Sequence, residues 1–385
     1  MAALKEIFKI SKGKKEEETE EGSKLSRRYI QIEDLRHNDN LKYCIPNKKS
    51  VHVNKDDLII AWDGANAGTI GVGLEGVIGS TLARLELKNN KVNPYYAARF
   101  LQSKFQYLRD NCTGATIPHI SKTVLENLSI PLPPLETQKK IVEVLDKAQR
   151  LIDARKEQIR LMDELIQSVF YEMFGDPVTN PKGWENQRLD SICTKIGSGA
   201  TPRGGKSSYK AEGISLIRSM NVHNGAFKYD ELAFIDNTQA KKLNNVIVEQ
   251  SDVLLNITGA SVARSCIVPE KILPARVNQH VSIIRVNKEK ANSRYINNLF
   301  ISSSFQKMLM KIAISGGATR EAITKEQLNE LYIPIPNIRL QNDFDIFVQK
   351  TEANKNLLLE ALIDLETNYY SLLQKSFRGE LFGGE

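Results

Sequence analysis

The stretch of this sequence that comes closest to a chemical motif is ATPRGGKS, at residues 200–207. A phosphate-binding P-loop needs glycine where Ala200 stands, and it needs a helix directly after it, whose first N–H groups bind the phosphate. The residues that follow, SYKAEG at 208–213, form helices poorly. We therefore do not expect nucleotide binding here.

The other residue types that carry chemistry are scattered. The five histidines, His37, His52, His119, His223 and His280, lack metal-ligand spacing, and the four cysteines lie far apart without a CxxC pair. There is no nucleophile elbow, kinase signature or Asn/Asp-Pro-Pro-Tyr/Phe motif of amino-methyltransferases. The pattern favours a binding protein over a catalyst.

The composition limits the size of the fold and the kind of partner that the protein can bind. The chain has 385 residues, 41% of them hydrophobic, and a formal net charge of +7. It is long enough for two globular domains, and its charge favours a polyanionic partner. No apolar signal core or stretch of 18 apolar residues occurs, so we expect a cytoplasmic protein with reduced thiols.

An internal repeat organises the sequence. Residues 114–141, GATIPHISKTVLENLSIPLPPLETQKKI, align without a gap to 317–344, GATREAITKEQLNELYIPIPNIRLQNDF, at an offset of 203 (333 − 130). Eleven of the 28 columns are identical. A weaker echo upstream matches Asp57-Leu58 and Gly64-Ala65 with Asp252-Val253 and Gly259-Ala260 at an offset of 195 (252 − 57). The chain is a tandem duplication of domain-sized copies.

Each copy has two parts. Residues 1–135 and 177–337 alternate short β-like runs, such as DLIIAW at 57–62, with turns rich in Gly and Asn, and short helical patterns follow. This predicts α+β domains. Residues 136–176 and 338–385 each predict one long helix of roughly 38 residues, about 57 Å.

Both long segments carry apolar residues at the alternating spacing of three and four that defines a heptad seam. The first seam comprises Ile141, Leu145, Ala148, Ile152, Ile159, Met162, Ile166, Val169 and Met173. The second comprises Phe344, Val348, Leu358, Leu362, Leu365, Tyr369 and Leu372, with the polar residues Thr351 and Lys355 at two further seam positions.

A single apolar seam must be buried against a partner, and the other copy is the simplest one. Antiparallel packing predicts two tandem globular domains separated by two long antiparallel coiled-coil helices, with internal pseudo-two-fold symmetry. The alternative is that each helix packs only on its own domain. Two related domains at a fixed separation suit duplex DNA, which symmetric proteins read as spaced half-sites.

Several motifs carry a resemblance to a known family. IPLPPLETQ and IPIPNIRLQ precede the helices, GDPVTNPKGWENQRLDSI opens the second domain, IGSGATPRGGKSSYKAEGISLIRSMNV follows it, and LLQKSFRGELF lies near the end of the sequence. With this order of parts, the whole chain resembles the DNA specificity subunit of type I restriction–modification systems. The first domain departs from the pattern, because residues 1–35 lack the Gly-rich TP loop found near 197–205.

The resemblance implies a subunit without catalytic activity of its own, within a type I deoxyribonuclease and adenine methyltransferase complex. Each target-recognition domain reads half of a bipartite, asymmetric site in double-stranded DNA. The helices set the spacer and dock two modification methyltransferase subunits, and two restriction motor-nuclease subunits join them. S-adenosylmethionine, ATP and Mg²⁺ belong to those partners, so no cofactor and no metal is expected in this chain.

Polar residues in the turns between β-like runs are the candidates for DNA contact. In the first domain they are Arg27, Arg28, Gln31, Asn66, Thr116, His119 and Lys122. In the second they are Arg203, Lys206, Arg218, Asn221, Thr258, Ser261, Arg264, Asn278, Gln279, Thr319 and Arg320. Thr116 and Thr319, shared by both copies, suit phosphate contacts, whereas Arg320, replaced by Ile117, suits a base contact.

Two rival functions stay open. A self-sufficient methyltransferase would need cofactor and catalytic motifs, which the sequence lacks. A coiled-coil protein-interaction scaffold without sequence-specific DNA binding would show no steep salt dependence towards DNA.

Overall fold

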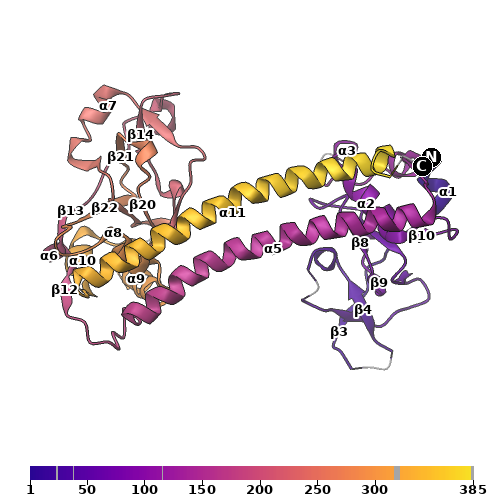
Figure 1. Cartoon of the computed structure of the whole chain (residues 1–385), viewed down its shortest axis with the longest axis horizontal. Coiled ribbons are helices and arrows are strands. Elements are labelled where there is room, and N and C mark those ends of the chain that lie inside the picture. The colour runs from indigo at the N-terminus through magenta and orange to yellow at the C-terminus, as the bar shows by residue number, and fades with distance from the viewer. Residues whose placement is uncertain (23–24, 38, 115, 316–320, 383–385) are drawn as a thin grey trace. The chain divides into compact units, whose positions relative to one another are not determined.

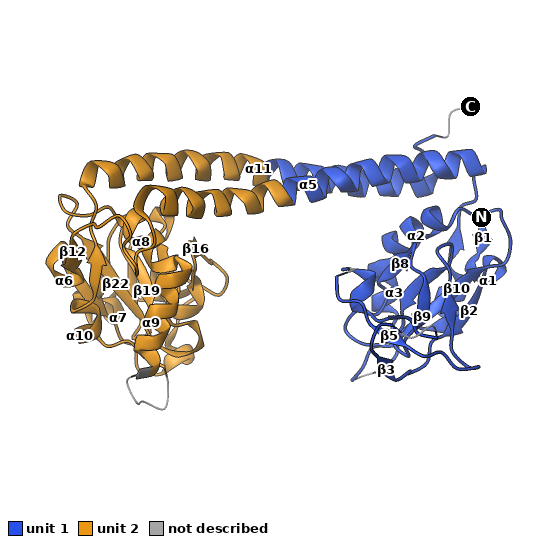
Figure 2. Cartoon of the chain, turned by 90° about the horizontal axis from the view of Figure 1, so that it is seen from below, with its two compact units in different colours: residues 1–156, 360–385 blue, residues 157–359 orange. Residues whose placement is uncertain are grey.

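The computed structural model describes residues 1–22, 25–37, 39–114, 116–315 and 321–382. The chain forms two compact units (Figure 2). Unit 1 comprises Met1–Lys156 and Glu360–Glu385, and unit 2 comprises Glu157–Leu359. Each unit therefore includes a globular α+β part and a stretch of both long helices, α5 and α11 (Figure 1).

The globular part of unit 1 is built from short strands and helices. In chain order they are β1 (Ala2–Ala3), α1 (Leu4–Ile7), β2 (Phe8–Lys12), β3 (Glu18–Thr19), β4 (Arg27–Ile30), β5 (Tyr43–Cys44), β6 (His52–Val53), β7 (Leu58–Ala61), β8 (Ile70–Val72), β9 (Gly76–Ile78), β10 (Leu82–Leu87), α2 (Pro94–Ser103), α3 (Phe105–Asp110), α4 (Lys122–Asn127) and β11 (Ser129–Ile130).

The globular part of unit 2 repeats this composition. Its elements are β12 (Asn186–Arg188), α6 (Leu189–Ile192), β13 (Cys193–Ser198), β14 (Ile214–Ile217), β15 (Val222–His223), β16 (Ala226–Phe227), β17 (Ala233–Ile235), α7 (Asn237–Lys241), β18 (Ile247–Val248), β19 (Val253–Asn256), β20 (Ser265–Ile267), β21 (Ala275–Val277), β22 (Val281–Val286), α8 (Ser293–Ile301), α9 (Ser303–Ser315), α10 (Lys325–Asn329) and β23 (Tyr332–Pro334).

The two units share one sheet topology. Unit 1 has an antiparallel sheet of order β2-β10-β7-β8, and unit 2 has the same arrangement as β13-β22-β19-β20. A second sheet in each unit contains one parallel pair, β4 with β9 and β14 with β21. A short pair, β1 with β11 and β12 with β23, then leads into each long helix. The duplication in the sequence is therefore a duplication of fold.

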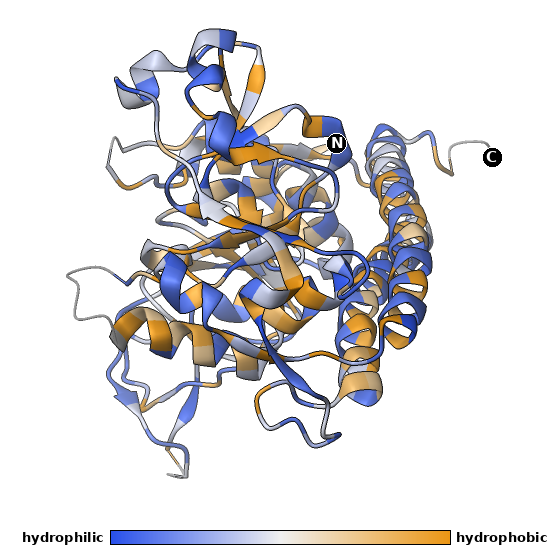
Figure 3. Ribbon diagram, turned by 90° about the vertical axis from the view of Figure 1, so that its left-hand side faces the viewer, coloured by the Kyte–Doolittle hydropathy of each residue, from blue (hydrophilic) through white to orange (hydrophobic). Residues whose placement is uncertain are grey.

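The two long helices are α5 (Leu135–Phe174) and α11 (Ile338–Arg378). α5 ends at Gly175, which has φ +78°, and its N–H donates to the carbonyl of Tyr171 at 2.9 Å. Glycine is favoured at a helix end because this left-handed conformation strains other residues. Hydrophobic positions recur among hydrophilic ones around both helices (Figure 3).

The helices run antiparallel within unit 2. Phe174, the last residue of α5, packs its ring 5.4 Å from that of Phe344 near the start of α11. Further back along α5, Asp163 accepts a hydrogen bond from Lys355 at 2.6 Å. Lys355, a polar interruption of the seam, thus makes an ion pair between the helices.

The helices also pack together within unit 1. Ile141, Leu145 and Ile152 of α5 share a core with Tyr369 and Leu373 of α11. At the edge of this contact, Lys156 pairs with Glu366 at 2.8 Å. The same core includes α1, α2 and the sheet, so the alternative of one helix packing alone on its own domain does not describe unit 1.

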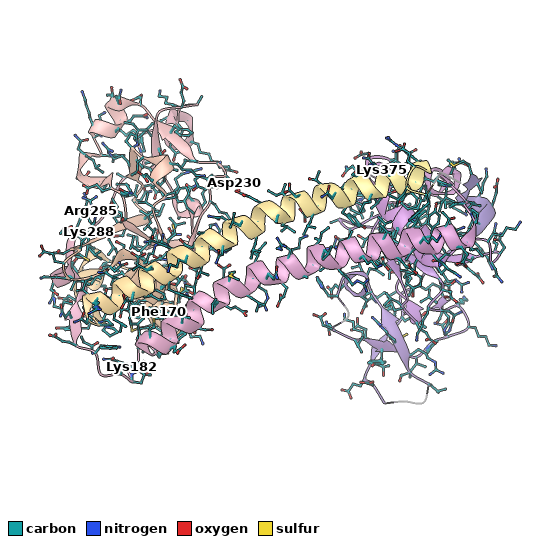
Figure 4. All side chains as sticks on the ribbon, viewed as in Figure 1. Phe170, Lys182, Asp230, Arg285, Lys288 and Lys375 are labelled. Atoms are coloured by element: carbon teal, nitrogen blue, oxygen red, sulfur yellow. The ribbon has the colours of Figure 1, made fainter. Side chains whose placement is uncertain are left out.

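Seam positions predicted from the sequence fall into two groups. Ile141, Leu145, Ile152, Ile166, Phe344, Val348 and Tyr369 are buried, and Ala148, Ile159, Met162, Val169, Met173, Leu358, Leu362, Leu365 and Leu372 are half-buried. Phe170, labelled in Figure 4, and Phe174 were not on the predicted seam but are buried. They pack on Tyr295 of α8 as well as on Phe344, so α5 has a wider apolar face here than a two-helix seam requires.

Candidate nucleic-acid interface

A loop follows the carboxyl end of equivalent strands in the two units, β7 and β19. We call residues 62–69 and 257–264 the Gly-Ala loops, because Gly64-Ala65 and Gly259-Ala260 occupy the same position in them. Both glycines have positive φ, +89° and +75°. The loop turns sharply there because glycine reaches this region without a steric penalty.

In unit 1 the Gly-Ala loop is bonded to the loop that carries Gly-Ala-Thr, residues 114–120. The N–H of Gly64 donates to the carbonyl of Pro118 at 2.9 Å, and the N–H of Ile120 donates to the carbonyl of Trp62 at 2.9 Å. Two motifs more than 50 residues apart in sequence thus meet at one end of the sheet.

Unit 2 makes the same two bonds with its own residues. The N–H of Gly259 donates to the carbonyl of Glu321 at 2.9 Å, and that of Ile323 donates to the carbonyl of Ile257 at 2.8 Å. The upstream echo is therefore bonded in both units to equivalent residues of the second repeated segment, Pro118 and Ile120 in unit 1 and Glu321 and Ile323 in unit 2, and we call each pair of loops a two-loop site. The predicted contacts Thr319 and Arg320 lie outside the described residues.

The side chains of the unit 1 site form a charged cluster. Asp63 pairs with Lys12 at 2.8 Å and with Nδ1 of His119 at 2.6 Å. Burial opposes ionisation of Asp63, but hydrogen bonds from Lys12 and His119 outweigh it, and the pKa of the carboxyl is lowered. The cluster therefore holds an ionised carboxylate between two groups that can donate to DNA.

Other predicted residues of unit 1 flank this cluster. Asn66 lies on the Gly-Ala loop and its amide oxygen accepts from Arg36, while Thr116 is exposed on the Gly-Ala-Thr loop. Lys122 is exposed at the start of α4 and pairs with Glu126 at 3.6 Å.

In unit 2 the equivalent side chains surround a hollow of about 500 Å³. Its wall includes Thr258, Ser261 and Arg264, three of the residues predicted from the sequence, together with His280 and Glu321. The hydroxyl of Thr258 is hydrogen-bonded to Nδ1 of His280. Within the described residues the Arg264 guanidinium has no hydrogen bond or ion pair, so it can bind an anion that enters the hollow.

A second group of predicted residues lies in other loops of unit 2. Arg203 and Lys206 are exposed, and Lys206 is in a short 3-10 turn at Gly205–Ser208 that no α-helix follows. Arg218 lies over the ring of Tyr209, 5.5 Å from its centroid, and donates to the carbonyl of Glu231. Exposed Gln279 bonds to Thr201.

Two predicted DNA contacts are in the wrong place for that role. Asn221 has no exposed surface, and its amide donates to the carbonyls of Lys228 at 3.0 Å and Asp230 at 3.2 Å. Asn278 is 4% exposed, and its side chain accepts from the N–H of His280 at 3.0 Å. Both side chains hold turns together instead of facing a ligand.

The β4 region of unit 1 gives a mixed result. Arg28 is mostly covered, and its guanidinium pairs with buried Asp34 at 2.9 Å, which assigns it a structural role. Arg27 is exposed and donates to the carbonyl of Ser26 at 2.8 Å, and Gln31 is half-buried.

Sequence reasoning missed four residues of the two sites: Lys12, Asp63, Arg36 and His280. A signal existed for one of them. Asp63 lies at the offset of 195 from the predicted residue Thr258 (258 − 63), so the echo could have paired them. Lys12 ends β2 and His280 immediately precedes β22, and only the sheet order shows that these positions lie near the loops.

Across the described ranges, no three His, Cys, Asp or Glu side chains lie together as a metal site would require. None of the helices in the described part of the chain combines the length and apolar composition needed to span a membrane.

Comparison with known families gives one match that covers most of the chain. Residues 1–161 and 181–366 match the model of the type I restriction modification DNA specificity domain. The chain is 26% identical over 360 residues to the type I restriction enzyme MjaVIII specificity subunit of Methanocaldococcus jannaschii, covering 90% of this chain and 82% of that one. It is 23% identical over 384 residues to the EcoBI specificity subunit of Escherichia coli, covering 91% and 79%.

Solved structures show the same fold. A chain from a study of complex assembly and conformational transition in a type I R-M system has a TM-score of 0.64 at 19% identity, with 99% of this chain and 97% of that one covered. The S subunit of a type I restriction-modification system from M. genitalium has a TM-score of 0.55 at 15% identity, with 98% and 95% covered.

Proposed function

The chain belongs to the type I restriction–modification DNA specificity family, and we propose that it is the subunit that selects the DNA sequence on which such a complex acts. Each unit binds one half of a bipartite, asymmetric site in double-stranded DNA. The chain performs no catalysis itself.

The observation that carries this proposal is the two-loop site, which recurs on the same backbone with different side chains. A repeated backbone suits a repeated ligand, the DNA duplex, whose phosphates look alike at both half-sites. Different side chains suit different bases: Asp63, Lys12 and His119 in unit 1, Thr258 and Arg264 in unit 2. The net charge of +7 supports a polyanionic ligand.

The long helices are proposed to set the spacer between the half-sites and to dock two modification methyltransferase subunits. Apolar side chains exposed on the helices support the docking role. Leu151 is 58% and Ile363 63% exposed in unit 1, and Leu357 is 63% exposed in unit 2. Large apolar side chains gathered on a surface are typical of a protein-binding face.

Cofactors belong to the partners under this proposal. The modification subunits bring S-adenosylmethionine for adenine methylation, and two motor-nuclease subunits bring ATP and Mg²⁺ for restriction. We place the assembled complex in the cytoplasm, where bacterial and archaeal DNA is found.

Methylome sequencing tests the function directly. A methylation-free host would express this chain with its neighbouring modification subunit, and a control host would lack this chain. We expect a bipartite adenine-methylated motif that is absent from the control. No new motif, with both proteins folded and co-purifying, would contradict the proposal and favour the scaffold, which would also lack salt-dependent DNA binding.

A further inference from the structure

A glutamine in the first turn of α5 is completely buried and bonded on both sides of its amide. The side chain of Gln138 has no exposed surface. Its oxygen accepts from the N–H of Asn93 at 2.8 Å, and its nitrogen donates to the carbonyls of Lys91 at 3.0 Å and Pro133 at 2.9 Å. Asn93 in turn caps α2, accepting from the N–H groups of Tyr95 and Tyr96.

The same arrangement recurs in unit 2. Gln341, at the offset of 203 from Gln138 (341 − 138), is also without exposed surface. Its oxygen accepts from the N–H of Asn292 at 2.9 Å, and its nitrogen donates to the carbonyl of Pro336 at 2.7 Å. Asn292 caps α8 by accepting from the N–H of Arg294.

A tyrosine completes each arrangement. The hydroxyl of Tyr96 donates to the carbonyl of Pro131 at 3.0 Å, and that of Tyr295 donates to the carbonyl of Pro334 at 2.7 Å. Burial raises the pKa of both phenols, so they stay protonated and act as donors at neutral pH. We call each set of glutamine, capping asparagine and tyrosine a helix clasp.

The clasps lie beside the short connections that lead into the long helices. Only residues 131–134 separate β11 from α5, and only 335–337 separate β23 from α11. These connections include Pro131, Pro133 and Pro134, which have no N–H to donate. Core packing holds each helix against its recognition domain, and the clasp adds directional hydrogen bonds at two points where the helix begins.

Ion pairs around the clasps differ between the units. Arg99 pairs with Asp146 at 2.6 Å in unit 1, whereas Arg294 pairs with Asp345 at 2.8 Å and Glu352 at 2.6 Å in unit 2. These ion pairs lie near the surface and do not occupy matching positions. Among these side-chain contacts of the described residues, the clasps recur at matching positions in both units and the ion pairs do not, which favours a shared positioning role for the clasps.

We propose that Gln138 and Gln341 are positioning residues that fix the angle at which each recognition domain sits on its long helix, and so set how strictly the complex discriminates spacer length. The inference rests on the proposed function. A domain free to tilt on its helix would reach a half-site one base pair nearer or farther. Loss of either clasp relaxes spacer discrimination and leaves the bases read at each half-site unchanged.

The test uses the full chain in complex with its modification subunits. DNA carrying both half-sites is methylated with the spacer that the wild type prefers and with spacers one base pair shorter or longer. For Gln138→Leu and Gln341→Leu we expect the ratio of preferred to altered spacer to fall by about tenfold, equivalent to about 1.4 kcal/mol. Gln158→Leu, at an exposed glutamine of α5, is the matched control and keeps the wild-type ratio.

A second variant decides the question if the leucine variants do not fold. Gln341→Glu keeps one acceptor, and when protonated it also keeps one donor. Burial raises the pKa of a carboxyl, so we expect near-wild-type spacer discrimination at pH 6 and relaxed discrimination at pH 8. A merely stabilising glutamine would change the yield of folded complex without changing this ratio.

The outcomes distinguish failure of the positioning role of the glutamines from failure of the proposed function. A folded Gln341→Leu complex with the wild-type ratio overturns the positioning role, as does a Gln341→Glu ratio that ignores pH. A change in the recognised bases overturns it too. A wild-type complex that methylates no bipartite site at all refutes the proposed function instead.

Discussion

Lengthening both long helices by one heptad should lengthen the spacer that the complex recognises. The insertions belong where the two compact units divide, after Lys156 in α5 and after Leu359 in α11. Seven residues keep the apolar seam in register, because the seam repeats every seven residues. Neither two-loop site is touched.

The size of the effect follows from helix geometry. Seven residues at 1.5 Å each add about 10.5 Å, close to three base pairs at about 3.4 Å per pair. Three base pairs also turn the duplex by about 100°, at about 10.5 pairs per turn, whereas one heptad drifts by only about 20°. We therefore expect the preferred spacer to grow by about three base pairs, with weaker binding because the second half-site is turned away.

The assay is methylation of a DNA library in which both half-sites are constant and the spacer varies. An insertion of seven residues in α5 alone is the control, because it throws the two helices out of register and should abolish activity. An unchanged preferred spacer in the double insertion, with the complex assembled, would refute the idea that the helices measure the distance.

Three further predictions concern single residues. Arg285→Ala should destabilise unit 2 by about 3–5 kcal/mol in urea unfolding, because the fully buried carboxylate of Asp252 loses the charge of the guanidinium and its two bonds of 2.8 Å, and retains the bond from the N–H of Glu249; a loss below about 1 kcal/mol would contradict this. Arg264→Ala should relax specificity at one half-site only, whereas equal weakening on all DNA, with the slope of log affinity against log salt reduced by about one, would make it a phosphate contact instead. Asp63 has a lowered pKa, so its carboxylate stabilises folded unit 1 above about pH 4 and loses this effect as the pH falls through the folded pKa. Asp63→Asn should reduce the loss of the unfolding midpoint that the wild type shows as the pH falls. An unchanged loss would argue against the ion pairs of Asp63 with Lys12 and His119.

The sequence predicted the long helices and the duplication well, because both leave periodic or repeated signals. It placed Val169 and Met173 on the seam, yet the structure buries Phe170 and Phe174 more deeply. A heptad count assumes one partner helix, whereas this end of α5 also packs on Tyr295. A single heptad period does not predict the burial of side chains that contact two different partners.

The candidate DNA contacts were harder to predict for a different reason. A polar residue in a turn can face solvent or close the turn by bonding to the backbone, and both choices favour the same residue types. Asn221 and Asn278 bond to the backbone within their turns. Thr258, Ser261 and Arg264 were predicted by the same criterion, as polar residues in a turn between β-like runs, and the structure places them around one hollow.

The two-loop sites explain how one duplicated backbone can serve an asymmetric target. Backbone bonds from Gly64 and Gly259 hold the loops in equivalent positions, so the side chains that we propose to contact DNA are presented at equivalent places in the two units. At those positions Asp63 is held by two donors, whereas Thr258 offers a hydroxyl beside an Arg264 without a partner among the described residues. Donors and acceptors in different orders match different base edges in the major groove. Under the proposed function, a few diverged side chains on this shared loop would let the two units bind half-sites of different sequence, while the long helices set the spacer between them.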